Sequence, residues 1–162
     1  DLYAHTSALS NGGNTIFVLA EGILKFSKKQ VVKNYLSNEN HVYISQFLPD
    51  SFWSASNAMR RNSVIIGLSR AMILVESGKS GGTFAAGEET LKRSLPLFVI
   101  DFEKPEVSAE ANPYFISAGG KPIRGKDGIP NLSKVLEVVR NNPNSKPSER
   151  NCIAVEQLKF NI

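Results

Sequence analysis

The stretch AMILVESGKSGGTF, residues 71–84, contains an apolar run that ends in a glycine-rich loop. The run has the length of a β-strand, and continuous apolar runs are typical of strands buried on both faces of a parallel sheet. Gly78, Gly81 and Gly82 allow the backbone to turn sharply after it. The residues that follow, 84–93, are predicted to form a helix. The stretch therefore predicts a strand, a tight turn and a helix in succession.

The same alternation extends over most of the chain. Apolar runs predict strands at 15–20, 41–45, 71–76, 95–100 and 121–123. Helices are predicted over 2–11, 28–37, 57–69, 84–93 and 130–140, and the segment 101–118 is predicted as loop. Strands that alternate with helices form βαβ units, which give an α/β fold with a parallel sheet and helices on both faces. Ligands of such sheets bind beyond the carboxyl ends of the strands, so the loops there are the first places to search for a site.

Length and composition predict one globular domain. The chain has 162 residues, of which 41% are hydrophobic and 21% are charged, and this suffices for one substantial core over residues 1–140. The run NNPNSKPSERN at 141–151 has the composition of a linker, so 141–162 is predicted to be a linker and a C-terminal arm. The single cysteine, Cys152, excludes an internal disulfide and a cysteine-cluster metal site. No metal or redox cofactor is predicted.

Charge and hydropathy narrow the class of partner. No apolar run approaches the ~20 residues of a membrane span, and no basic segment followed by an apolar one suggests a signal peptide. We therefore expect a cytoplasmic protein without a membrane partner. The net charge is +4, and the basic excess lies mostly in the first half of the chain. Such an excess allows an anionic partner without requiring one.

The glycine-rich loop has the chemistry of a phosphate site. The helix that opens near Thr83 offers unpaired N–H groups and the positive end of its dipole, and both attract phosphate. Ser80 and Thr83 add hydroxyl donors and Lys79 adds a cation. The loop is not a Walker A motif, because no Lys-Ser/Thr pair follows its last glycine. A tight turn with a simple helix cap remains the alternative interpretation.

Two arginines open the helix predicted at 57–69. Arg60 and Arg61, followed by Asn62, stand where basic side chains oppose the helix dipole. Phosphate would turn this repulsion into attraction, because arginine binds it bidentately. Phe52 and Trp53 lie just before them, in a long loop, where exposed aromatic rings can stack on nucleic-acid bases. The alternatives are a solvated or ion-paired arginine pair, and rings that fix the loop onto the core.

Together these segments resemble the DprA/Smf (DNA-processing protein A) family over roughly residues 1–125. The family pattern of Asp, Ala-His, Ala-Leu and Gly-Gly-x-Thr-Ile-x-Val-Leu is matched by Asp1, Ala4-His5, Ala8-Leu9, Gly12-Gly13, Thr15-Ile16 and Val18-Leu19. The family block Arg-Arg-Asn-Arg-Ile-Ile-Ala-Gly-Leu-Ser is similar to residues 60–69, with Ser63 in place of its third arginine. The Ser-Gly-Ser/Thr loop and the Pro-Leu-Phe-Val strand are matched by Ser80-Gly81-Gly82-Thr83 and by Pro96 to Val99.

The resemblance implies a Rossmann-like three-layer domain with a mainly parallel sheet. The family's first strand would precede Asp1, so the sheet of this chain is expected to lack it. The resemblance further implies a non-enzymatic protein that binds single-stranded DNA, protects it in natural transformation, helps to load RecA and forms homodimers. Arg61 and Asn62 would contact phosphate or an adjacent base, with Arg60 nearby. Ser80, Gly81, Gly82 and Thr83 would line the phosphate pocket.

Two other functions fit the same fold, because fold does not determine function. One is a nucleoside monophosphate phosphoribohydrolase of the lysine-decarboxylase-like (LOG) group, which carries Pro-Gly-Gly-x-Gly-Thr-x-x-Glu. Here no proline precedes the glycines, and the glutamate after Thr83 comes only at Glu88. The other is a nucleotide-binding sensor module that uses the same pocket for a free ligand.

Overall fold

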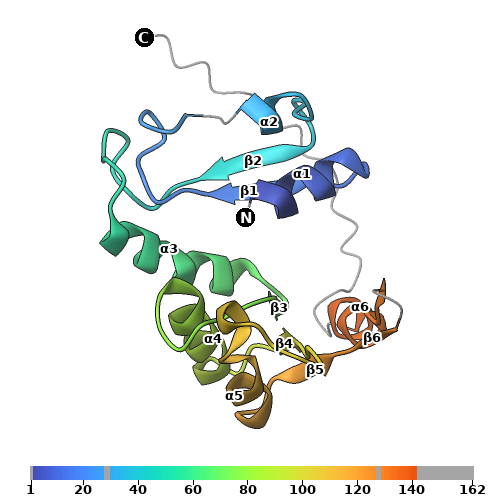
Figure 1. The fold of residues 1–162 in the computed structure, drawn as a ribbon. Coiled ribbons are helices and arrows are strands. Elements are labelled where there is room, and N and C mark those ends of the chain that lie inside the picture. Colours follow the sequence, from blue (N-terminus) through green and yellow to red (C-terminus); the bar gives the residue numbers. More distant parts are fainter. Residues whose placement is uncertain (1, 28–29, 127–128, 142–162) are drawn as a thin grey trace.

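The computed structural model describes residues 2–27, 30–126 and 129–141 and confirms the α/β class (Figure 1). The helices are α1 (Leu2–Ser10), α2 (Gln30–Lys33), α3 (Ala55–Leu68), α4 (Gly82–Lys92), the 3-10 helix η1 (Val107–Ala109), α5 (Asn112–Ser117) and α6 (Ser133–Arg140). The strands are β1 (Thr15–Val18), β2 (His41–Ile44), β3 (Met72–Leu74), β4 (Leu97–Ile100), β5 (Lys121–Ile123), β6 (Gly125–Lys126) and β7 (Ile129–Pro130).

The parallel strands divide between two sheets, where the sequence predicts one. β1 pairs with β2, in a register that runs from Thr15↔His41 to Val18↔Ile44. The second sheet has the order β3-β4-β5, and a small antiparallel ribbon is formed by β6 and β7. Within the described residues, the second edge of β1 carries no strand partner. The parallel pairing within both larger sheets confirms the expectation of a mainly parallel arrangement.

The three-stranded sheet lies at the centre of three layers. In β4, Leu97 and Val99 face α4 and α5 and pack on Leu74 and Phe115. Phe98, on the opposite face of the same strand, packs against Ile123 and against Val135 of α6. Alternate residues of one strand thus enter two different cores, as the period of a β-strand requires. We call β3, β4 and β5 with α4, α5 and α6 the three-stranded half.

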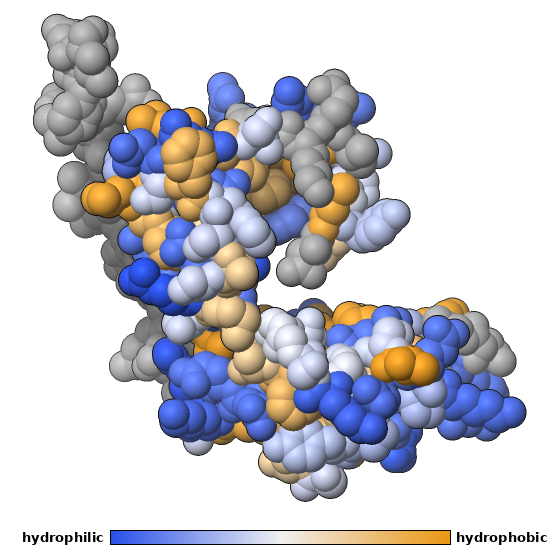
Figure 2. All heavy atoms as spheres, turned by 60° about the vertical axis from the view of Figure 1, so that its left-hand side comes forward, coloured by the Kyte–Doolittle hydropathy of each residue, from blue (hydrophilic) through white to orange (hydrophobic). Residues whose placement is uncertain are grey.

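The two-stranded sheet has a smaller core on one face. Phe17 and Leu19 pack against Leu9 of α1 and Val32 of α2. Ile16, which points to the other face of β1, is half exposed. We call β1 and β2 with α1 and α2 the two-stranded half. Helix α3 runs between the halves, and Figure 2 shows a deep indentation of the surface between them.

Several details of the secondary structure differ from the prediction, and α2, for example, ends at Lys33 where a helix is predicted to residue 37. Helix α3 begins at Ala55, because Ser54 caps it by accepting a hydrogen bond from the Asn57 amide at 3.0 Å. The segment 101–118, predicted as loop, contains η1 and α5, and Pro113 stands in the first turn of α5, where its missing N–H has no cost. The last helix begins at Ser133, since Pro130 belongs to β7.

Two predictions concern the ends of the chain and membranes. The linker and arm predicted at 141–162 lie outside the described residues, apart from Asn141. Of the helices in the described part, none has both the length and the apolar character needed to cross a bilayer.

Candidate functional site

The turn between β3 and α4 presents backbone amides to solvent. Ser80, Gly81, Gly82 and Thr83 are all exposed. Gly81 is the N-cap of α4, with φ of +96°, a conformation that a side chain would strain. Gly81 has no side chain to cap the helix, so no side-chain cap covers the first N–H groups of α4. Exposed N–H groups at a helix start, together with the helix dipole, are suited to binding an anion.

A buried asparagine anchors this turn from below. Asn112, at the start of α5, accepts a hydrogen bond from the Ser77 amide at 3.0 Å. Its Nδ2 donates to the carbonyls of Val75 at 2.8 Å and Ile100 at 2.9 Å. One side chain thereby ties together the ends of β3 and β4 and the base of the turn. Sequence analysis missed Asn112, although an Asn followed by Pro113 is a helix-start signal that could have revealed it.

Lys79, in the same turn, has a partner. Its Nζ lies 3.1 Å from Oε2 of Glu110, and the lysine side chain is largely exposed. Exposed ion pairs of this kind contribute little to stability and exchange readily with other partners. Lys79 therefore stays available to an anion that reaches the turn.

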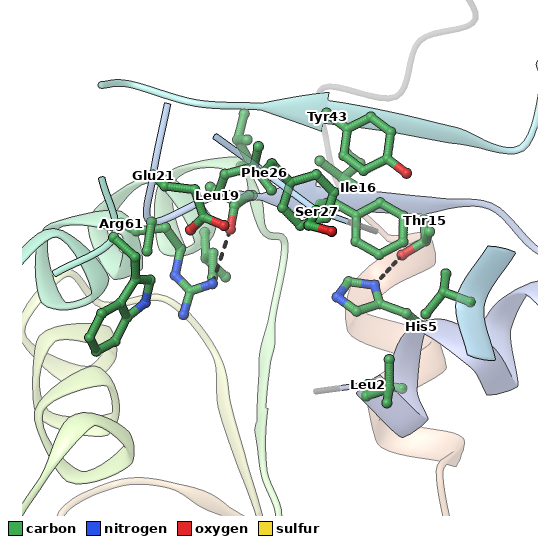
Figure 3. A pocket seen from close by; sticks show the side chains of 18 of the residues that line it. Leu2, His5, Thr15, Ile16, Leu19, Glu21, Phe26, Ser27, Tyr43 and Arg61 are labelled. Atoms are coloured by element: carbon green, nitrogen blue, oxygen red, sulfur yellow. Dashed lines mark hydrogen bonds between the residues drawn. The ribbon is translucent and has the colours of Figure 1, made fainter. Parts of the chain in front are cut away.

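Arg61 points away from the turn, toward β1. Its Nη1 donates to the Val18 carbonyl at 3.0 Å (Figure 3). Its Nε is buried and has no hydrogen-bond partner among the described residues. A buried donor without a partner is costly, and the guanidinium has further N–H groups to offer an anion.

Arg61 faces a cavity of about 820 Å³ that also contacts the open edge of β1. The cavity is lined by residues of α1, β1, α2, β2 and α3, with Glu21 and Trp53 among those from the loops. No residue of the 77–83 turn lines it. The structure therefore places Arg61 and the glycine turn in separate surroundings, where the resemblance implies a shared pocket.

His5 faces the same cavity from α1 (Figure 3). Its Nδ1 lies 2.7 Å from Oγ1 of Thr15, and its ring stacks on Phe17 with centroids 4.3 Å apart. Burial lowers the pKa of His5 below its usual value, and the positive charge of Arg61 lowers it further. His5 is therefore less readily protonated, so the positive charge that an anion would meet in the cavity is that of Arg61.

The remaining predicted residues lie on α3, which packs on α4. A Cβ added to Gly82 would lie 3.9 Å from Sδ of Met59, the residue before Arg60. Arg60 is exposed, with its guanidinium 5.5 Å from the centre of the Phe47 ring, and Asn62 is half-buried. Arg60 and Arg61 lie in the second turn of α3 and not at its start, because Ser54 caps the helix several residues earlier.

No cluster of three or more His, Cys, Asp or Glu side chains suited to a metal ion occurs within the described ranges. The region contains amides, hydroxyls and guanidinium groups, which are groups that can bind anions. The exposed turn offers the amides, whereas the cations of α3 lie elsewhere: Arg60 beside Phe47 and Arg61 at the cavity.

Comparison with known proteins gives consistent results. The sequence profile of the DNA recombination-mediator protein A family matches residues 1–133. The DNA processing protein DprA of Streptococcus pneumoniae is 28% identical over 125 residues, which are 76% of this chain and 44% of that protein. The X-ray structure of that protein superposes with a TM-score of 0.68 at 27% identity, again covering 76% of this chain and 44% of the solved one.

A second solved structure shares the fold. DNA processing protein A from Helicobacter pylori, studied for its single-stranded DNA binding mode, superposes with a TM-score of 0.61 over 77% of this chain and 55% of its own. Its identity is 19%, so it supports the fold alone. The chain spans about half the length of these relatives or less.

Proposed function

The chain belongs to the DNA recombination-mediator protein A family, and from this premise we propose that it binds single-stranded DNA through backbone phosphates. The observation that carries the proposal is the uncapped, exposed start of α4 at Ser80–Thr83. A phosphate there would accept hydrogen bonds from amides that no side-chain cap occupies. Lys79 supplies charge within the turn, Arg60 supplies it beside Phe47, and Arg61 supplies it at the cavity beside β1.

A charge placed in the turn tests the proposal without weakening the helix. Thr83→Glu puts a carboxylate in the first turn of α4, where it favours the dipole but repels phosphate. We expect about tenfold weaker binding of labelled oligo-dT in fluorescence polarisation, which corresponds to about 1.4 kcal/mol. The slope of log K against log salt should also become shallower by about 0.7 for each phosphate that the variant no longer neutralises.

Ser133→Glu is the matched control. It adds the same charge to the first turn of α6, also at an exposed position, on a helix that lies apart from α4 (Figure 1). We expect it to leave oligo-dT binding almost unchanged. Equal losses of affinity for the two variants would mean that net charge, and not the turn, governs binding.

The two alternative functions predict other outcomes. A sensor module would bind a mononucleotide tightly and oligo-dT weakly or not at all. A phosphoribohydrolase would release free base from a nucleoside monophosphate, which chromatography detects. Either result, without salt-dependent oligo-dT binding, would contradict the proposal.

We extend the proposal to the full-length protein of this family. We propose a cytoplasmic, non-enzymatic homodimer that loads RecA onto incoming strands in natural transformation. Family membership supports this extension. Light scattering of the purified protein tests the dimer, and a RecA filament-assembly assay on coated single strands tests the loading.

A further inference from the structure

Two aromatic side chains project into solvent from the loop between β2 and α3. Phe52 is 74% exposed and Trp53 is 63% exposed. Rings of this size are usually buried, because each removes a large apolar area from water. The expected structural role, fixing the loop onto the core, therefore does not account for either ring.

The loop that carries the rings is held in place by the loop after β1. The Gly22 amide donates to the Ser51 carbonyl at 2.8 Å, and the Leu24 amide donates to the Pro49 carbonyl at 2.9 Å. Any side chain at Gly22 would collide with the backbone of Leu48 and Pro49. The two loops thus form one paired unit at the carboxyl ends of β1 and β2, which is the ligand edge of such a sheet. We call this unit, residues 21–25 and 48–53, the loop pair.

Cations flank the rings. Nζ of Lys25 lies 4.5 Å from the centre of the Phe52 ring. Neither Lys25 nor Arg60 forms an ion pair within the described residues. Trp53 and Arg61 line the same cavity, so a group stacked on Trp53 would lie near the partly buried guanidinium of Arg61. Exposed rings with unpaired cations beside them suit a ligand that has flat bases and a phosphate backbone.

We propose that the loop pair is a base-stacking platform, on which Phe52 and Trp53 stack on bases of single-stranded DNA while Lys25 neutralises the backbone. This inference rests on the proposed function and adds to it a second contact region, distinct from the turn before α4. Stacking on rings tolerates any base, because every base has a π-face. The platform therefore contributes affinity without sequence preference.

Intrinsic fluorescence reports directly on the platform, because Trp53 is the only tryptophan of the chain. The probes are oligo-dT and an abasic oligonucleotide of equal length, which keeps the phosphates and lacks the bases. We expect oligo-dT to quench Trp53 emission and the abasic strand to leave it nearly unchanged. Equal quenching by both strands would overturn stacking.

Polarisation measurements with substitutions give the affinity. Phe52→Ala and Trp53→Ala should each weaken oligo-dT binding between about 5- and 150-fold, the range for one stacked base. Trp53→Phe should restore most of the affinity. Tyr3→Ala is the matched control, because Tyr3 is an 89% exposed aromatic residue on α1, and it should leave binding unchanged.

The outcomes separate this inference from the proposed function. If oligo-dT fails to bind, the proposed function fails and the platform fails with it. If oligo-dT binds, Thr83→Glu weakens it, and both alanine variants bind as the unchanged protein does, only the platform is overturned. If the rings contact a protein partner and not DNA, Phe52→Ala and Trp53→Ala should likewise leave the affinity for oligo-dT unchanged.

Discussion

The two halves of the molecule use the same elements but cover their sheets differently. In the three-stranded half, helices lie on both faces, and Val99 and Phe115 are 0% exposed. In the two-stranded half, helices lie on one face, and even the core residue Phe17 keeps 8% of its surface exposed. The cavity that Arg61 and His5 line extends into this smaller core and is also lined by Phe17. The three-stranded half therefore has the more completely buried core, and the two-stranded half has the cavity.

A sheet covered by helices on both faces offers a ligand mainly the loops at the ends of its strands. The three-stranded half accordingly offers the turn at Ser80–Thr83. The two-stranded half offers a cavity, an open strand edge and exposed rings. Under our two proposals, each half contributes a different kind of contact, amides for phosphate in one and rings for bases in the other.

The largest expected difference between the halves lies in their cores. Phe115→Ala should lower the free energy of unfolding by about 5 kcal/mol, because the fully enclosed ring leaves a void behind. Phe17→Ala should cost about 3 kcal/mol, since its site borders a cavity and its ring is less completely enclosed. Urea unfolding followed by circular dichroism measures both. If Phe115→Ala fails to fold, Phe115→Leu and Phe17→Leu repeat the comparison at lower cost. Equal decreases in the free energy of unfolding would show that the halves are equally well packed.

Sequence periodicity predicts the strands because apolar runs are local. The strands at 15–18, 41–44, 72–74, 97–100 and 121–123 all lie within the ranges predicted for them. The helices that depend on caps are displaced by a few residues, as with Ser54 and α3. α5 escapes prediction because six residues are too few to show a helical period. Its role depends on Asn112, whose partners come from distant strands.

The candidate site was predictable in its chemistry but not in its arrangement. The glycines and hydroxyls of the 80–83 turn carry their own signal, because a turn and a helix start are local events. The direction in which the Arg61 side chain points could not be predicted locally, because its hydrogen-bond partner is the carbonyl of Val18, 43 positions away. The exposure of Phe52 depends likewise on the pairing of two loops through Gly22. Both features depend on contacts between residues that are distant in the sequence.

Smaller changes in the free energy of unfolding should follow when two glycines within helices are replaced by alanine. A Cβ at Gly87 would lie 2.6 Å from the Phe115 ring, so Gly87→Ala should overpack the three-stranded half and cost about 2 kcal/mol. Gly67→Ala is the matched control in α3, where a Cβ has nothing within 4 Å. There alanine should stabilise the protein by about 0.5 to 1 kcal/mol. Thermal unfolding distinguishes the two signs, and a neutral Gly87→Ala would mean that the Phe115 site can relax.

The smallest effect is a pH dependence confined to the two-stranded half. Burial lowers the pKa of His5 in the folded state, whereas in the unfolded chain it is about 6.5. As the pH falls below that value, the unfolded chain takes up a proton that folded His5 resists, so the free energy of unfolding decreases. Above it, the contribution is constant. His5→Gln can keep the hydrogen bond to Thr15 but does not titrate, so the variant should lose less stability between pH 7.5 and pH 5.5. Carboxylates titrate in both proteins, so their contribution cancels in the difference. Equal acid destabilisation of the two proteins would exclude His5 as the source of the pH dependence. The two halves would then not differ in their response to acid.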